Sequence, residues 1–261
     1  MPRSLEELSQ AAGDLLEAGR PAEALQVYAS AVKLAQEGHR QRELSDLLGD
    51  MAVAYRRTGD TASAIGTNRL AIEAARASAY DLNVARWSGN LGGLLYNGGD
   101  LDGAEACFRD AAMAAARLGD PRQMSIAGGH FGSLMGERGR FSEAVAELEH
   151  ACAIAGKAPD VLAIVREQQA DLFCKWAYSL RQGRRQREAR DVINRAFADL
   201  GDAVPGKAAV MLLMLLADLD ENDGNVVGAV ATIERAAKVA EASGDGAHAA
   251  ELRDLGRRMR G

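Results

Sequence analysis

Six alanines recur at nearly constant spacing along this 261-residue chain. They are separated by 40, 40, 40, 45 and 40 residues, and a second alanine follows each of them by seven residues. A period of this length is typical of a stacked repeat array, in which each repeat is one supersecondary unit. The first set is Ala24, Ala64, Ala104, Ala144, Ala189 and Ala229, and the second is Ala31, Ala71, Ala111, Ala151, Ala196 and Ala236. The ladder therefore predicts a fold of six repeats.

Composition indicates that these repeats are helical. Hydrophobic residues make up 48% of the chain, mostly alanine and leucine, while aromatic residues make up 5% and prolines number five. Alanine and leucine are strong helix formers, and small alanines let helices approach closely. With 26% charged residues and a net charge of -6, the chain has the composition of a globular protein and not of a disordered one.

Each period has the pattern of helix A, a tight turn, helix B and a second turn. In the second repeat Leu44, Leu47 and Leu48 are spaced to share one helix face. Gly59 then breaks the helix, because glycine readily takes the left-handed cap conformation, and Asp60 or Thr61 can cap the next helix. The pattern predicts an all-α fold of helix-turn-helix repeats.

We expect one domain over residues 1–261, because a solenoid grows by adding repeats around a continuous core. The 45-residue step places extra residues either in 159–171 or in the arginine-rich turn at 183–185. A final amphipathic segment would cap the last open core face. The predicted repeats cover about residues 3–38, 39–78, 79–119, 120–157, 158–202 and 203–244, with the cap at 246–260.

These residues carry a resemblance to the tetratricopeptide repeat (TPR). The TPR pattern runs from a small residue through a leucine or aromatic, a glycine, an alanine and a bulky residue to a second alanine. In the third repeat these residues are Gly92, Leu95, Gly99, Ala104, Phe108 and Ala111. The 40-residue period is similar to the long-helix subclass of kinesin light chains and LGN-type adaptors. The resemblance implies a right-handed α-α superhelix whose A helices line a concave wall that binds other proteins. Asn68 stands where a bulky residue is usual, which predicts weaker packing there.

The same register predicts which side chains face the concave groove. Fixed guanidinium and amide groups on this wall could bind the carbonyls or the acidic side chains of an extended peptide. A competing interpretation is that the basic groups only solubilise the surface or pair with Asp46, Asp50 and Glu137 across the groove. The predicted partner-binding residues are Arg56, Arg57, Arg86, Asn90, Tyr96, Asn97, His130, Glu137, Lys175 and Tyr178.

Glycines are frequent in the middle of the predicted groove, although each glycine inside a helix costs about 0.5–1 kcal/mol relative to alanine. Two explanations stay open: close approach of a ligand backbone, or close packing of one helix on another. The positions are Gly49, Gly89, Gly93, Gly129 and Gly136.

No motif in the chain predicts an enzyme, a cofactor or a metal site. The four histidines form no metal-binding pattern, and the glycines at 128–132 lie inside a predicted helix, where they cannot cradle a phosphate. The run Asp218–Gly224 resembles the start of a calcium loop but lacks its later glycine and glutamate. His130 is expected to be a satisfied structural residue or a peptide contact. The basic stretch Arg181–Arg195 has no interleaved aromatics, which argues against nucleic-acid binding.

The sequence favours a cytoplasmic protein. Its three cysteines show no paired spacing, its first residues form no apolar signal, and the apolar stretch Ala208–Ala217 is about half as long as a membrane span. We expect a protein or peptide partner, with an acidic peptide as one candidate, and no nucleic acid or membrane. Two functions stay open, a passive adaptor and a regulatory sensor that binds a signal peptide or controls a transcription factor or protease. Self-association through the MLLMLLA helix is a further alternative.

Overall fold

A computed structural model describes residues 4–156, 158–201 and 204–260. The described residues form helices and turns and contain no strand. They divide into two compact units, residues 1–131 and 132–261, and each is considered by itself. The expectation of one continuous domain stays a prediction. The predicted repeat limits at residues 3, 157, 202 and 203 lie outside the described residues.

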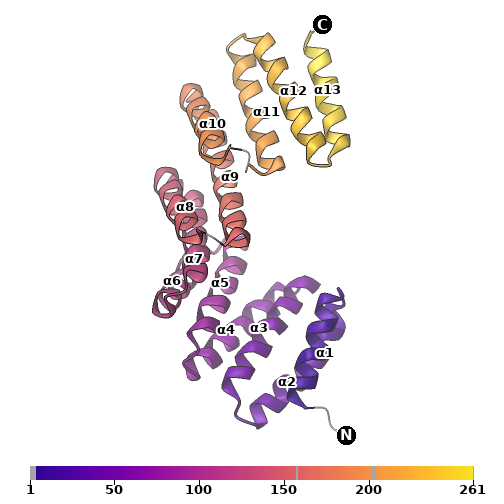
Figure 1. The fold of residues 1–261 in the computed structure, drawn as a ribbon, viewed down its shortest axis with the longest axis vertical. Coiled ribbons are helices and arrows are strands. Elements are labelled where there is room, and N and C mark those ends of the chain that lie inside the picture. Colours follow the sequence, from indigo (N-terminus) through magenta and orange to yellow (C-terminus); the bar gives the residue numbers. More distant parts are fainter. Residues whose placement is uncertain (1–3, 157, 202–203, 261) are drawn as a thin grey trace. The chain divides into compact units, whose positions relative to one another are not determined.

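The first unit consists of helices in consecutive pairs (Figure 1). Its first helix is capped by Ser4, whose Oγ accepts from the Glu7 backbone N–H at 3.1 Å while Glu7 Oε2 accepts from the Ser4 N–H at 2.9 Å. The helices are α1 (Leu5–Glu17), α2 (Pro21–Glu37), α3 (Gln41–Thr58), α4 (Thr61–Ala77), α5 (Asp81–Asn97) and α6 (Leu101–Leu118), followed by the first part of α7 (Pro121–Glu137).

The second unit continues the same alternation after the end of α7. Figure 1 shows its last three helices side by side, and the final helix buries Ala249 and Leu252 against the preceding one. This confirms the capping helix. The helices are α8 (Phe141–Ala155), α9 (Pro159–Gln182), α10 (Gln186–Leu200), α11 (Gly206–Asn222), α12 (Val226–Ala242) and α13 (Gly246–Arg260).

The alanine ladder forms the packing centre of the helix pairs. Every alanine of both sets is buried, with an exposed fraction of 4% at most. Because helices at these positions pack without room for a larger group, an added side-chain volume would cost about 1–3 kcal/mol. The prediction of six helix-turn-helix repeats with a cap is confirmed.

The turns follow the predicted pattern, except that the non-glycine residues His39, Ala79 and Arg184 take the left-handed conformation at three of them. Gly59 is left-handed at φ 85°, and Asp60 Oδ1 accepts from the Ser63 backbone N–H at 3.0 Å as the N-cap of α4. In the fifth repeat the left-handed position is taken by Arg184, at φ 58°, five residues before Ala189. The arginine-rich turn therefore has ordinary length, and the extra residues of this repeat lie in α9, which has 24 residues.

The apolar run of α11 is largely used inside the second unit. Leu212 and Leu213 are buried, whereas Met211 is 54% exposed. Self-association through this helix stays a prediction. None of the helices in the described part of the chain is long and apolar enough to span a bilayer.

Candidate functional site

Two adjoining cavities open between α3, α5 and the first part of α7, all within the first unit. The Arg86 cavity, of about 240 Å³, is lined by Arg86, Gly89, Asn90, Gln123, Ile126 and His130 together with Ala85, Ala111 and Ala127. The Asn68 cavity, of about 150 Å³, is lined by Ala52, Val53, Arg56, Asn68, Gly89, Asn90, Gly93, Leu94, Asn97 and His130. Gly89, Asn90 and His130 line both cavities, which together we call the groove.

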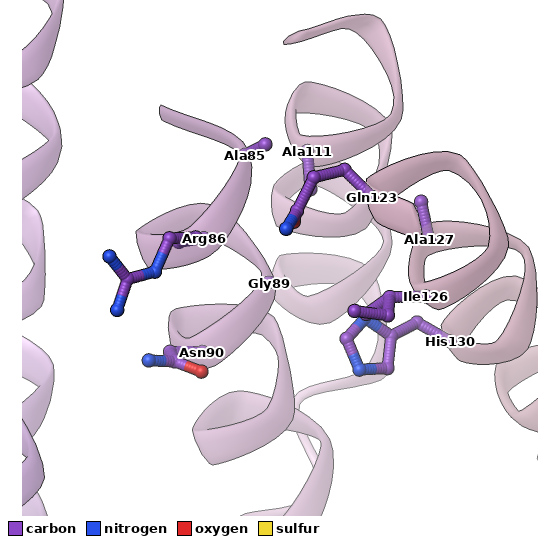
Figure 2. A pocket seen from close by; sticks show the side chains of 9 residues that line it. All are labelled: Ala85, Arg86, Gly89, Asn90, Ala111, Gln123, Ile126, Ala127 and His130. Atoms are coloured by element: carbon purple, nitrogen blue, oxygen red, sulfur yellow. The ribbon is translucent and has the colours of Figure 1, made fainter. Parts of the chain in front are cut away.

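One face of α5 supplies the shared wall of the groove. Arg86, Gly89, Asn90, Gly93 and Asn97 lie at successive spacings of three, one, three and four residues, which places them on one side of a helix. Figure 2 shows Arg86 and Asn90 on α5 and Gln123, Ile126 and His130 on α7, with Gly89 between the two sets. The groove wall is therefore rich in hydrogen-bond donors.

His130 is held by a ring contact and carries an unsatisfied nitrogen. Its imidazole stacks on Phe108 of α6 at a centroid distance of 4.6 Å and an interplanar angle of 22°. Burial lowers the pKa of His130 to about 4, so the ring is neutral near pH 7. Its Nδ1 is shielded from solvent and has no hydrogen-bond partner. Of the two expected roles, a satisfied structural residue or a peptide contact, the unpartnered Nδ1 does not fit the first, and the peptide contact stays a prediction.

Asn68 on α4 is a second unsatisfied group in the groove. The side chain is only 2% exposed, and its Oδ1 has no hydrogen-bond partner. A buried polar atom left without a partner costs about 1–3 kcal/mol. Sequence reasoning noticed Asn68 only as a departure from the usual bulky residue, and it did not assign Asn68 or Gln123 to the site. The departure itself was the available signal.

Two predicted arginines form no ion pair. Neither Arg56 nor Arg86 has a carboxylate partner within 4.0 Å in the part of the chain that the structure describes. The Arg86 guanidinium lies 4.6 Å from the centroid of the Trp87 ring. The competing interpretation, direct pairing with Asp46 and Asp50, therefore does not hold for these two residues, although the charge of Arg86 still acts on Asp50.

Arg57 has a structural contact. Its Nη1 donates to the carbonyl oxygen of Leu16 at 2.6 Å, near the C-terminal end of α1. The same carbonyl accepts from the Gly19 backbone N–H at 3.2 Å, so Arg57 adds a second hydrogen bond at the end of this helix. Replacing Arg57 would therefore disturb α1, and its contact with a partner stays a prediction.

A carboxyl group on α3 whose pKa is shifted interacts with the charge of Arg86, although it lines neither cavity. Burial raises the pKa of Asp50 to about 6, with the charge of Arg86 opposing and that of Asp46 adding to this effect. Asp46 itself accepts a hydrogen bond from Asn83 Nδ2 at 2.7 Å. The first unit thus contains a carboxyl group and an imidazole, Asp50 and His130, that both titrate below neutral pH.

The remaining predicted residues lie elsewhere. Tyr96 is half-buried on α5 and does not line either cavity. Glu137, Lys175 and Tyr178 belong to the second unit, where Lys175 forms an ion pair with Glu137 and Tyr178 is 53% exposed. The interpretation of basic groups paired across the wall holds for Lys175.

The groove glycines divide between the two explanations. A Cβ at Gly49 would lie 2.1 Å from Trp87 Cε2, and a Cβ at Gly136 would lie 2.4 Å from Leu172 Cδ1, so these glycines serve helix packing. A Cβ at Gly93 would meet nothing within 4 Å, and one at Gly89 would make an ordinary 3.4 Å contact with His130 Cε1. Packing does not account for Gly93, and close approach of a ligand there stays a prediction.

The acidic run and the basic stretch of the second unit satisfy each other. Arg181 Nη2 donates to Asp218 Oδ1 at 2.9 Å, and Arg190 donates to Asp220 Oδ1 at 2.8 Å and to Asp223 Oδ2 at 2.9 Å. Most of the run lies inside α11, so it forms no calcium loop. The arginines are partly neutralised, which weakens the case for a nucleic-acid surface.

Solved structures similar to this chain share its helical repeats. The apo form of RapI matches with a TM-score of 0.65 at 11% identity, over 98% of this chain and 97% of that chain. The TPR-like repeats of a protein described as a kinesin light chain from Podosopora anserina match with a TM-score of 0.53 at 14% identity, over 74% and 93%. The chain has a TPR-like fold. A TPR-like repeat in this chain accounts for the 40-residue spacing of its alanines. The predicted resemblance is therefore confirmed for the fold.

A third similar structure is a Rap protein complexed with Competence and Sporulation Factor, with a TM-score of 0.54 at 13% identity, over 95% of this chain and 73% of that chain. No family model and no curated protein matches the TPR-like chain. At identities of 11–14% the likeness concerns the fold, and the site must be judged from its own residues.

Proposed function

We propose that this chain is a non-enzymatic binding scaffold that receives a peptide or a helical segment of another protein in the groove. One observation carries the proposal. The groove combines two unpaired arginines with two buried polar atoms that lack partners, Asn68 Oδ1 and His130 Nδ1. Burying such atoms is unfavourable unless a bound group supplies their hydrogen bonds.

The size of the cavities favours a peptide over a small molecule. Small-molecule pockets usually enclose about 300–1,000 Å³. The groove cavities measure about 240 and 150 Å³ and lie next to each other along α5. Each can accept a single side chain, so adjacent residues of a longer ligand could occupy both.

Charge supports an acidic or carbonyl-rich ligand near the Arg86 cavity. Arg86 and Gln123 offer donors there, and guanidinium groups bind carboxylates in two-point contacts. The free cysteines Cys107, Cys152 and Cys174 are consistent with a reducing compartment, so we propose that binding takes place in the cytoplasm.

A random library of short linear peptides, selected on the immobilised chain, tests this function. Reversing Arg56 and Arg86 to glutamate should weaken the selected peptides about tenfold or more, because two donors would become repulsive acceptors. Arg57 stays unchanged because it contacts α1. The matched control reverses two exposed arginines outside the groove, Arg69 and Arg187. Equal binding by both double variants would place the site elsewhere.

A regulatory sensor is the second candidate. The observation that favours it is the similar Rap protein that was solved with Competence and Sporulation Factor bound. A sensor should change its radius of gyration when a selected peptide binds, and a passive adaptor should not. Small-angle scattering with and without the peptide separates the two.

A further inference from the structure

The Asn68 cavity has a floor and a rim of different chemistry. Asn68 comes from α4 and is 2% exposed, whereas Arg56, Asn90 and Asn97 come from α3 and α5 and are exposed. Its carboxamide therefore lies at the bottom of the cavity. Of the ten lining residues, none is an aspartate or a glutamate.

The floor requires a hydrogen-bond donor from the ligand. Asn68 Oδ1 is a carbonyl oxygen and can only accept. A carboxylate has no N–H or O–H to offer it and would place negative charge against the carbonyl dipole. An acidic side chain therefore suits the Arg86 cavity but not this floor.

The rim requires an acceptor from the same ligand group. Arg56, Asn90 and Asn97 carry guanidinium and amide N–H groups. A ligand ammonium would satisfy Asn68 but would be repelled by Arg56. His130, neutral near pH 7, adds one nitrogen that can pair with either a donor or an acceptor according to its tautomer.

A side-chain carboxamide meets both requirements at one end of a short chain. Its NH₂ donates and its oxygen accepts, and both project in the same direction. The N–H and C=O of one trans peptide unit point to opposite sides, so a single backbone amide cannot present both to the floor and the rim. A cavity of about 150 Å³ leaves space for one side chain of this size.

We propose that the Asn68 cavity is a specificity subsite for an asparagine or glutamine side chain of the bound peptide. This inference rests on the proposed function, since it names one residue of the ligand that the groove receives. Gly93, whose Cβ would meet nothing within 4 Å, leaves room for the ligand backbone beside the cavity.

The test uses peptides selected from the random library on the full chain. The tightest peptide is resynthesised with its Asn or Gln replaced by the isosteric Asp or Glu. The wild-type chain should bind the acidic version about tenfold or more weakly, since one buried acceptor would lose its donor. In the Asn68→Leu variant the difference should shrink to about twofold, because the acceptor is gone. Asn194→Leu, an exposed position on α10, is the matched control.

A second variant keeps the proposal testable if Asn68→Leu fails to fold. His130→Phe keeps a ring beside Phe108 and removes Nδ1, so it should also reduce the amide preference. Selected peptides that show no amide preference, or one unchanged in both variants, would overturn the subsite while leaving the scaffold function intact. Recovery of no binding peptide would overturn the scaffold function and the subsite with it.

Discussion

The groove of the first unit and the α9–α11 surface of the second unit use arginine in opposite ways. In the second unit Arg181 and Arg190 donate to Asp218, Asp220 and Asp223. In the groove Arg56 and Arg86 have no ion pair in the described part of the chain, although the charge of Arg86 opposes the rise in the pKa of Asp50. Paired arginines hold helices together, whereas unpaired ones leave their hydrogen bonds available to a ligand.

The difference extends to buried polar groups. The groove keeps Asn68 Oδ1 and His130 Nδ1 buried without partners. In the second unit the buried carboxylate of Asp220 instead accepts from Arg190, and Thr232 Oγ1 lies 3.5 Å from it, although Gln168 Oε1 is buried there without a partner. The Asp220 cluster therefore contributes to folding stability, whereas the two groove atoms lower it.

The largest effect is expected from Asp220→Ala in the second unit. The side chain of Asp220 is 10% exposed and that of Arg190 is 31% exposed. Removing the carboxylate leaves a half-buried guanidinium with only Asp223, which should lower the free energy of unfolding by about 2–3 kcal/mol. Urea denaturation followed by circular dichroism measures the loss.

Arg56→Ala in the groove is the counterpart. It removes no ion pair and should change the free energy of unfolding by less than about 0.5 kcal/mol. Similar losses in the two variants would mean that both regions are structural, and the contrast between them would disappear.

The fold was predictable because its requirements are local and repeated. Ala64 and Ala104 are buried since each helix pair needs a small residue at the same point, and Gly59 is left-handed since a tight turn needs one there. Arg184 shows the limit of this reasoning. It takes the left-handed position in the fifth repeat, so the sequence alone could not decide between a longer turn and a longer α9.

The sequence predicts which side chains face the groove, but not which groups those side chains contact. Helical register places Arg86, Asn90 and His130 correctly on the groove, because register determines which way a side chain points. It cannot say which group a long side chain meets, and the structure pairs Arg57 with the Leu16 carbonyl. Asn68 was missed because α4 was expected to lie outside the groove, while its side chain reaches the floor between α3 and α5.

The next effect concerns Asp50 and His130, the two groups of the first unit that titrate below neutral pH. The pKa of Asp50 is raised from 3.8 to about 6, so the folded chain binds this proton more strongly and loses stability as the pH rises through 6. The pKa of His130 is lowered from 6.5 to about 4, so the unfolded chain binds that proton more strongly and stability is lost as the pH falls. Over the same range the two contributions oppose each other.

Single variants should therefore show a dependence of stability on pH that cancels in the wild type. On acidification from about pH 7 to about pH 4, Asp50→Asn should lose about 2 kcal/mol relative to wild type, and His130→Phe should gain about 2 kcal/mol. Denaturation curves at both pH values give the two differences. Asp191→Asn, at an exposed position of α10, is the control and should follow the wild type. Parallel pH profiles for all four chains would show that the first unit does not bury these groups.

A small gain in stability is expected at Gly93, where a single variant separates folding from binding. A methyl group there meets nothing within 4 Å, so Gly93→Ala should raise the free energy of unfolding by about 0.5–1 kcal/mol through helix propensity alone. Gly66→Ala on α4, whose Cβ also meets nothing within 4 Å, should give the same gain. Only the Gly93 variant should weaken the selected peptides, because only its methyl group occupies the groove. If the two variants bind equally well, the open space beside Gly93 is not where the ligand lies, and the unpaired arginines of the groove lose their proposed purpose.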